Sequence, residues 1–437
     1  MGTTPKSSKA LPIALTVIIL ILAATTLGVL LFLANQPVQT RGLPTLVAID
    51  PLEPDSSQWG LNFPNQYTSF LKMRENAART EFGGSQPYQK VDADPRLKRL
   101  FAGNAFSKDY KEDRGHVYSL QDVRETQRVN EKTPGTCYSC KTANAPQLWA
   151  EMGPVAFAKT PFKDLGQRID QPIGCANCHE AGTMRLIVTN PALEAALKEQ
   201  GKDWRTFTRQ EMRTVVCANC HVEYYFAGEE KVLTFPWDHG VKVEAIEQYY
   251  NELGFSDWKH AETAAPMIKM QHPEYELYTA DSTHYKAGVA CADCHMPYVR
   301  DGAVKYSSHN VHSPLLNPQQ ACGACHTNVD YVVARVGLIQ RQVAVTMSAS
   351  EDALVAAIDA IVAASQNPNA DPALLEEARQ LHRAAQLRWD FIAAENSMGF
   401  HNPEEALRIL AASIDLARQA QLKALQAVST GALQARR

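Results

Sequence analysis

The sequence has no strong excess of charge of either sign and no basic cluster beyond its N-terminus. Its 437 residues include 43 Lys and Arg against 47 Asp and Glu, a formal net charge of −4. Because surfaces that bind nucleic acid normally carry a basic patch or stripe, we expect no nucleic-acid partner. The sequence also lacks a regular internal repeat, which excludes a solenoid of identical modules.

No cysteine stands alone: all ten occur in five Cys-x-x-Cys pairs. The pairs are Cys137–Cys140, Cys175–Cys178, Cys217–Cys220, Cys291–Cys294 and Cys322–Cys325. Four of them are followed directly by a histidine: His179, His221, His295 and His326. Cys-x-x-Cys-His is the attachment signature of c-type haem, in which the histidine is the proximal iron ligand. The pattern predicts a mainly α, multihaem c-type cytochrome with a haem-packed core.

Other interpretations of the cysteines explain less. A structural zinc site needs four ligands, so two pairs would have to combine, and five pairs is an odd number. Disulfides give the four repeated histidines no role, and a thioredoxin-like redox site would occur once. The haem interpretation is therefore favoured.

The first pair is an exception, because Cys140 is followed by Lys141 instead of histidine. A lysine amine must be neutral to donate to iron, and coordination to the metal favours that form. If no distal side chain covers this iron, its sixth position is open to substrate, which an enzyme needs and an electron relay does not. The alternative is that Lys141 is an accidental change and the haem only conducts electrons.

An uncharged apolar run covers residues 11–34, and Lys6 and Lys9 precede it. A helix of this length spans about 36 Å, enough to cross a bilayer. A cleaved signal peptide is the alternative, but its apolar core is usually shorter and no good small-x-small site closes this run. We therefore expect an uncleaved transmembrane anchor, with the remaining chain on the extracytoplasmic, periplasmic side.

Composition divides the chain into four parts. Residues 1–40 form the anchor or signal segment, 41–65 a Pro-rich linker, 66–340 the pentahaem catalytic region, and 341–437 a helical region packed on the haem core.

Three long helices are expected in the last part. The first should begin near Ser348, where Ser348 and Glu351 resemble a capping box. The second should begin at Asp371-Pro372 and the third at Asn402-Pro403. On the third, one face collects apolar residues at helical spacing: Leu407, Leu410, Ile414 and Ala417. Either these helices pack only on the haem core or part of their surface meets a second subunit.

Several separate motifs resemble those of the pentahaem, ammonia-forming cytochrome c nitrite reductases, over about residues 60 to 425. One is the order of the haem motifs, with Cys-x-x-Cys-Lys first. The others are Arg114-Gly115-His116-Val117-Tyr118 with Asp122-Val123-Arg124 and Arg128, Cys220-His221-Val222-Glu223-Tyr224-Tyr225-Phe226, Phe235-Pro236-Trp237-Asp238, Lys269-Met270-Gln271-His272-Pro273-Glu274-Tyr275, and His401-Asn402-Pro403-Glu404-Glu405.

The resemblance implies a six-electron reduction of nitrite to ammonium. Lys141 would be the proximal ligand of the active-site haem, with Arg128, Tyr224 and His272 forming the distal pocket. Arg128 offers a cationic fork to a small anion, and the other two can donate hydrogen bonds and protons. Related reductases of hydroxylamine, sulfite or tetrathionate, and a conduit with no substrate of its own, remain alternatives.

The resemblance also implies cofactors and partners. One calcium ion would be bound by Glu223, Gln271 and the carbonyls of Tyr224 and Lys269, all oxygen ligands. The distal haem ligands would be His116 for Cys217–Cys220, His309 for Cys175–Cys178, His401 for Cys291–Cys294 and His284 for Cys322–Cys325. His239, His260, His312 and His382 would have no haem role. A membrane multihaem quinol dehydrogenase would supply electrons, and the C-terminal helices would form a homodimer.

Overall fold

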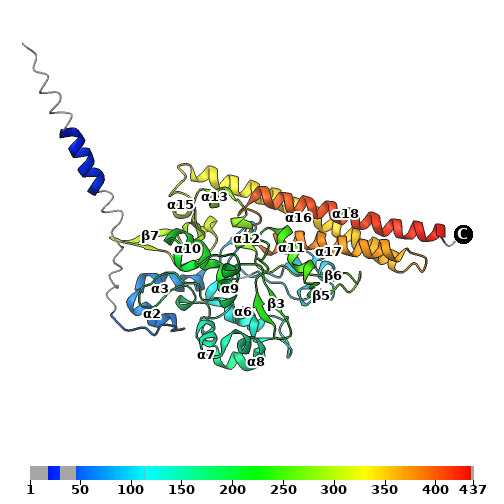
Figure 1. The fold of residues 1–437 in the computed structure, drawn as a ribbon, viewed down its shortest axis with the longest axis horizontal. Coiled ribbons are helices and arrows are strands. Elements are labelled where there is room, and N and C mark those ends of the chain that lie inside the picture. The colour runs from blue at the N-terminus through cyan, green and yellow to red at the C-terminus, as the bar shows by residue number, and fades with distance from the viewer. Residues whose placement is uncertain (1–17, 30–45, 113, 435–437) are drawn as a thin grey trace, which may run out of the picture. The chain divides into compact units, whose positions relative to one another are not determined.

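The computed structural model describes residues 18–29, 46–112 and 114–434 (Figure 1). The chain divides into two units, residues 1–45 and 46–437. Residues 18–29 are helical. The described part of the chain contains no helix that is both long and apolar enough to span a bilayer. Half of the expected anchor, residues 11–17 and 30–34, lies outside the described residues.

The second unit is mainly helical, and most of its elements are short. The α-helices before the C-terminal region are α2 Ser56–Asn62, α3 Pro64–Leu71, α4 Lys90–Ala93, α5 Arg96–Leu100, α6 Ser119–Glu125, α7 Ala145–Lys159, α8 Phe162–Leu165, α9 Pro191–Glu199, α10 Arg209–Val215, α11 Val243–Glu252, α12 Glu274–Thr279, α13 Thr283–Lys286, α14 Cys291–His295 and α15 Pro318–Ala321. The 3₁₀ turns are η1 Lys72–Glu75, η2 Ala105–Ser107, η3 His116–Tyr118, η4 Gly135–Tyr138, η5 Gly166–Arg168, η6 Cys175–Asn177, η7 Trp204–Thr206, η8 Val216–Asn219 and η9 Pro314–Leu316.

The strands form four separate antiparallel hairpins. They are β1 Arg79–Thr80 with β2 Gly83–Gly84, β3 Tyr225–Ala227 with β4 Val232–Thr234, β5 Trp258–Lys259 with β6 Pro266–Met267, and β7 Tyr298–Asp301 with β8 Val304–Ser307. Such short elements bury little surface between themselves, as expected for a region organised around cofactors.

Three long helices form the C-terminal part: α16 Val329–Ser365, α17 Pro372–Ala394 and α18 Pro403–Gln434. They pack on one another and extend together away from the short elements of this unit (Figure 1). The predicted starts of α17 and α18 are confirmed, and the side chain of Asp371 accepts hydrogen bonds from Ala373 and Leu374. The predicted apolar face of α18 is also confirmed, since Leu410 and Ala417 are fully buried.

The predicted helix start at Ser348 is wrong. α16 begins at Val329, where the side chain of Asn328 caps the helix by accepting from the backbone of Tyr331. Ser348 lies inside α16, and its hydroxyl accepts a hydrogen bond from Arg96 instead. The boundary drawn at residue 340 falls within the same helix, so the haem region continues directly into the helical region.

The largest buried cluster joins the two regions. It contains Leu100 and Phe101 near α5, Tyr250 of α11, and residues of all three long helices, with Trp389 fully buried. Phe101 and Trp389 lie 5.6 Å apart between ring centroids. The C-terminal helices are therefore part of the wall behind the site and do not form a separate domain.

Candidate functional site

The five cysteine pairs lie on short helical turns. Cys137, Cys175, Cys217 and Cys291 lie in η4, η6, η8 and α14, and Cys322 directly follows α15. In a helical turn, residues three apart lie on the same side, so both thiols of a pair can face one porphyrin edge. All cysteines except Cys137 line a single cavity of about 1750 Å³, larger than the roughly 300–1,000 Å³ of ordinary small-molecule pockets.

The structure brings each motif histidine to a second histidine distant in sequence. The ring centroids lie 6.3 Å apart for His116 and His221, 6.2 Å for His179 and His309, 6.4 Å for His284 and His326, and 6.2 Å for His295 and His401. Two imidazole nitrogens, each about 2 Å from one metal ion, place the ring centroids about 6 Å apart. The spacing of all four pairs therefore fits an iron between the rings.

Hydrogen bonds orient several of these rings. Nδ1 of His179 lies 3.0 Å from the carbonyl oxygen of Met184, and Nδ1 of His309 lies 2.9 Å from that of Ser307. An Nδ1–H that donates to a carbonyl leaves Nε2 as the lone-pair nitrogen, the usual arrangement of metal-bound histidine. Burial also lowers the pKa of His179 to about 4, so the ring is neutral at pH 7, as a ligand must be.

Glu395 has the same role for His401. Its Oε2 lies 3.1 Å from Nδ1 of His401, and the carboxylate is fully buried. Glu395 also accepts from the backbone of Gly399 and the hydroxyl of Ser397, which holds the loop before α18. Sequence reasoning missed Glu395, and only its position six residues before a candidate ligand hinted at it.

A glycine places His116 at the start of η3. Gly115 has φ of 106°, a left-handed conformation that other residues rarely adopt. The chain can therefore turn there and direct His116 towards His221. Next to this pair, His221 lies 6.5 Å from His272 between ring centroids.

Lys141, Tyr224 and His272 line the same cavity. Burial, together with the nearby Cys140 and Cys137, raises the pKa of the Tyr224 hydroxyl, which therefore stays protonated at neutral pH. The carbonyl of Lys141 accepts from the hydroxyl of Ser119, which fixes the backbone after the first cysteine pair.

Arg128 lies in the loop that follows α6, near the first cysteine pair. Its charge opposes the effect of burial, which raises the pKa of both Cys137 and Tyr224. Lys141, Tyr224 and His272 thus line the cavity. Arg128 is not among the lining residues, but it lies close enough to Cys137 and Tyr224 for its charge to act on both.

The residues expected to bind calcium also come together in part. Glu223 is fully buried, and its Oε2 accepts from the backbone N–H of Gln271 at 2.6 Å. The side-chain amide of Gln271 lies 3.0 Å from the carbonyl oxygen of Lys269. If the amide is rotated by 180°, its oxygen takes the place of its nitrogen and lies on the side of the Lys269 carbonyl. The two orientations have nearly the same shape. Within the described residues, no cluster of three or more His, Cys, Asp or Glu could hold a metal by itself.

The other histidines occupy different surroundings. His260 and His382 are buried with ring centroids 5.2 Å apart, and His239 is paired with Glu252 at 2.7 Å. His312 lies beside the paired rings, with its carbonyl 3.3 Å from Nδ1 of His295.

Comparison with known proteins agrees with this geometry. The sequence profile of the Cytochrome c552 family matches residues 55–436. Cytochrome c-552 of Parabacteroides distasonis is 40% identical over 384 residues, 86% of this chain and 77% of the relative. The cytochrome c nitrite reductase subunit NrfA of Nitratidesulfovibrio vulgaris is 38% identical over 409 residues, 84% of this chain and 78% of the relative.

A solved structure has the same fold. The cytochrome c nitrite reductase of Desulfovibrio desulfuricans superposes with a TM-score of 0.84 and 37% identity, covering 89% of each chain. That structure is described as containing two calcium sites in its catalytic subunit. The fold and site are those of a multihaem c-type cytochrome. This chain belongs to the cytochrome c552 family, and the expected relationship to the cytochrome c nitrite reductases is confirmed.

Proposed function

We propose that this protein reduces nitrite to ammonium at a c-type haem attached to Cys137 and Cys140 and bound by Lys141. The observation that carries the proposal is the contrast between the motifs. Four motif histidines each face a second histidine at 6.2–6.4 Å, whereas the first motif has Lys141, which lines the same cavity as Tyr224 and His272. The names of the relatives support the same substrate.

When bound, the haem at the first pair would supply an iron that binds nitrite and delivers electrons to it. The Arg128 guanidinium attracts the anion and stabilises negative charge while N–O bonds break. Tyr224, kept protonated by burial, donates a hydrogen bond to a nitrite oxygen. His272 lies at the same cavity and supplies protons to the departing oxygens.

The other four haems would relay electrons to this site, with the ligand pairs named above. The positions of the cysteines support such a relay: the thiol of Cys140 lies near that of Cys220, and the thiol of Cys217 lies near that of Cys291. Attachment cysteines this close would bring the edges of successive porphyrins together. Cys178 also lies near Cys220, and Cys322 lies near Cys294, so five covalently bound haems in all would form one connected path.

One calcium ion is proposed at Glu223, Gln271 and the carbonyls of Tyr224 and Lys269. The close approach of Glu223, Gln271 and Lys269 supports it, as does the oxygen-only ligand set. Because Tyr224 follows Glu223 and His272 follows Gln271, the ion would fix both distal residues.

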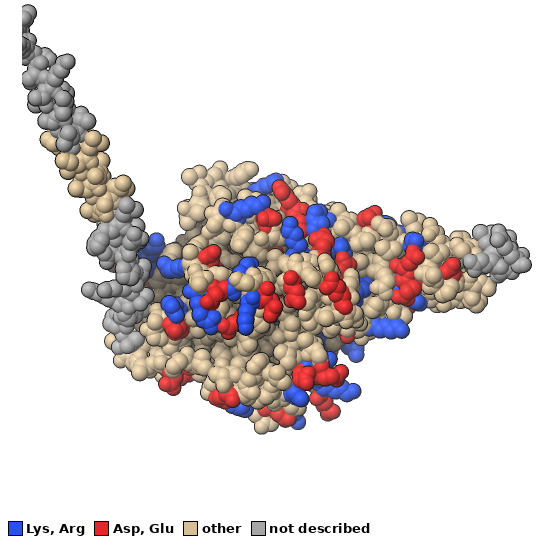
Figure 2. Space-filling model, viewed as in Figure 1, with Lys and Arg blue, Asp and Glu red and all other residues tan. Residues whose placement is uncertain are grey.

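Partners and location follow the same proposal. We place the enzyme on the periplasmic side, held to the membrane by residues 11–34, close to a membrane multihaem quinol dehydrogenase that donates electrons. A homodimer through α16 is supported by an exposed apolar stripe at heptad spacing, Tyr331, Leu338 and Val345, which are 66%, 51% and 72% exposed. On the face shown in Figure 2, charges of both signs intermingle.

The decisive experiment supplies purified protein with a reduced dye and nitrite and quantifies ammonium. We expect ammonium in proportion to the dye oxidised, and a high-spin component in the ferric spectrum. Lys141→His, which completes a standard motif, should keep the haem attached but lower the rate at least tenfold. Haems that reduce normally without producing ammonium would instead indicate an electron conduit.

A further inference from the structure

Two contacts fix the side chain of Arg128. Its Nε donates to the hydroxyl oxygen of Thr126 at 3.1 Å. Its guanidinium carbon lies 4.2 Å from the centroid of the Phe106 ring, a cation–π contact. Arg128 is only partly buried, so neither contact follows simply from close packing of a core residue.

Asp109 determines how the Thr126 hydroxyl is oriented towards Arg128. It is 1% exposed, and its Oδ2 accepts from the Thr126 hydroxyl at 2.7 Å and from the backbone of Gln127 at 2.7 Å. Its other oxygen accepts from the side chain of Gln89 at 2.8 Å. Burial raises the pKa of Asp109, but these hydrogen bonds outweigh it and the pKa is lowered, so the carboxylate is ionised. An ionised carboxylate only accepts, so the Thr126 proton points to Asp109 and its lone pair faces Arg128.

Phe106 is itself held firmly. Its ring packs edge-to-face on Tyr110, with centroids 5.0 Å apart, and lies 6.0 Å from Phe101. The ammonium of Lys269, a residue of the proposed calcium loop, lies 4.8 Å from the same ring. The surface against which Arg128 rests is therefore a fixed part of the core.

We propose that Asp109, Thr126 and Phe106 are positioning residues that hold the Arg128 guanidinium ready to receive a small oxyanion. Arginine has many rotatable bonds, and binding an anion with an unrestrained side chain costs conformational freedom. A guanidinium whose Nε already donates to Thr126, and whose flat face rests on Phe106, avoids that cost. Its other N–H groups remain available for the anion. This inference rests on the proposed function, because it takes Arg128 as the anion-binding residue.

The test compares Thr126→Val, which keeps the shape and removes the hydroxyl, with Thr126→Ser, which keeps the hydroxyl. Nitrite affinity is measured on the oxidised, fully haem-loaded protein from the change in haem absorption, and KM and kcat are measured separately. We expect Thr126→Val to raise the Kd and KM for nitrite about tenfold, or about 1.4 kcal/mol, with kcat changed less than threefold. Thr126→Ser should stay within about twofold of the wild type.

A double-mutant cycle separates positioning from a merely structural role. In an Arg128→Gln background the effect on Kd should disappear, because no guanidinium is left to orient. Thr346→Val is the matched control and should leave Kd unchanged. It removes a threonine hydroxyl that donates a hydrogen bond to the backbone carbonyl of Gln342 in α16. An unchanged Kd in Thr126→Val, or a full additional loss in the Arg128→Gln background, overturns the inference.

A second variant covers failure to fold. If haem content or the thermal midpoint shows that Thr126→Val does not fold, Phe106→Leu replaces it, with an expected threefold rise in Kd; an unchanged Kd then overturns the inference. If the wild type itself does not bind nitrite, the proposed function fails and this inference fails with it. If the wild type produces ammonium and the variants bind nitrite equally well, only the positioning role is wrong.

Discussion

The ammonium group of Lys269 lies 2.8 Å from the carboxylate of Asp390, and both side chains are buried. Asp390 also accepts from the backbone N–H of Met270 at 2.8 Å. Lys269 belongs to the loop of the proposed calcium ligands, and Asp390 belongs to α17. The pair therefore fastens the loop of the proposed calcium ligands to the C-terminal helices.

Asp390→Asn should destabilise the protein strongly. The variant keeps the shape of the side chain but leaves the charge of Lys269 buried without its partner, which typically costs about 3–5 kcal/mol. We expect a clear fall in the thermal midpoint of the purified protein. Glu377→Gln is the matched control, because it breaks the exposed pair of Lys423 and Glu377 at 2.6 Å, worth about 0–1 kcal/mol. Equal shifts in the two variants would contradict the prediction.

His309 and His312 differ by three positions, and only one should be an iron ligand. His309 lies 6.2 Å from His179 between ring centroids, whereas His312 places its backbone carbonyl 3.3 Å from Nδ1 of His295, a ring that is already paired with His401. His309→Ala should therefore convert one low-spin ferric haem into a high-spin one, measured by electron paramagnetic resonance. His312→Ala should leave the low-spin signal intact, and a high-spin haem in that variant instead would reverse the assignment.

The sequence was most informative where chemistry depends on neighbouring residues. The Cys-x-x-Cys motifs and the helix starts at Pro372 and Pro403 depend on spacings of a few positions, so both could be predicted. The start of α16 could not, because the same spacing at Ser348 and Glu351 also occurs inside helices. There both side chains contact Arg96, some 250 positions away.

Contacts between residues that are far apart in the sequence also explain which parts of the site the sequence did not reveal. The choice of His309, His401, His116 and His284 as distal ligands came from family resemblance, since nothing in their local sequence separates them from His312. Asp109 had no signal in the sequence, and Glu395 had only its position near His401, because what marks both residues is burial beside Thr126 and His401. Such second-layer contacts require the folded chain.

Removal of calcium should impair nitrite binding in the distal pocket more than electron transfer through the haems. Glu223 is buried, and burial raises its pKa, so without a cation its charge is costly in the folded state. We expect a calcium chelator to lower the thermal midpoint and raise the KM for nitrite, and calcium to restore both. Magnesium should restore little, because it demands stricter octahedral geometry. Dye-driven reduction of the haems is the internal control and should be unchanged, and an unaltered KM would argue against the site.

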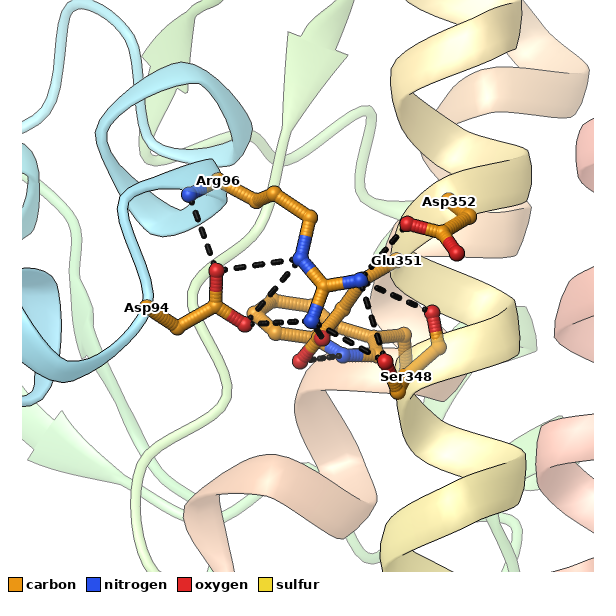
Figure 3. A network of polar contacts seen from close by, with 6 residues as sticks. Asp94, Arg96, Ser348, Glu351 and Asp352 are labelled. Atoms are coloured by element: carbon orange, nitrogen blue, oxygen red, sulfur yellow. Dashed lines mark hydrogen bonds and ion pairs between the residues drawn. The ribbon is translucent and has the colours of Figure 1, made fainter.

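The carboxyl of Glu351 should make stability fall as pH rises. Figure 3 shows the network: Arg96 lies between Asp94, at 2.6 Å, Glu351, at 2.5 Å, and Asp352, at 2.6 Å. One cation thus faces three carboxyl groups, and Glu351 is the most buried of them, with 8% of its side chain exposed. Burial, reinforced by Asp94, raises the pKa of Glu351 to about 8.

Because this pKa lies above that of the unfolded chain, about 4.3, the folded state holds the extra proton between these values. The free energy of unfolding should then decrease as pH rises through that window, at up to about 1.4 kcal/mol per pH unit. Glu351→Gln keeps the side-chain shape and cannot titrate, so its thermal midpoint should change less from about pH 5 to pH 8. Asp352→Asn, at a side chain that is 68% exposed, should keep the wild-type slope. Parallel pH profiles for the wild type and Glu351→Gln would show that Glu351 is ionised throughout, with Arg96 alone balancing its charge.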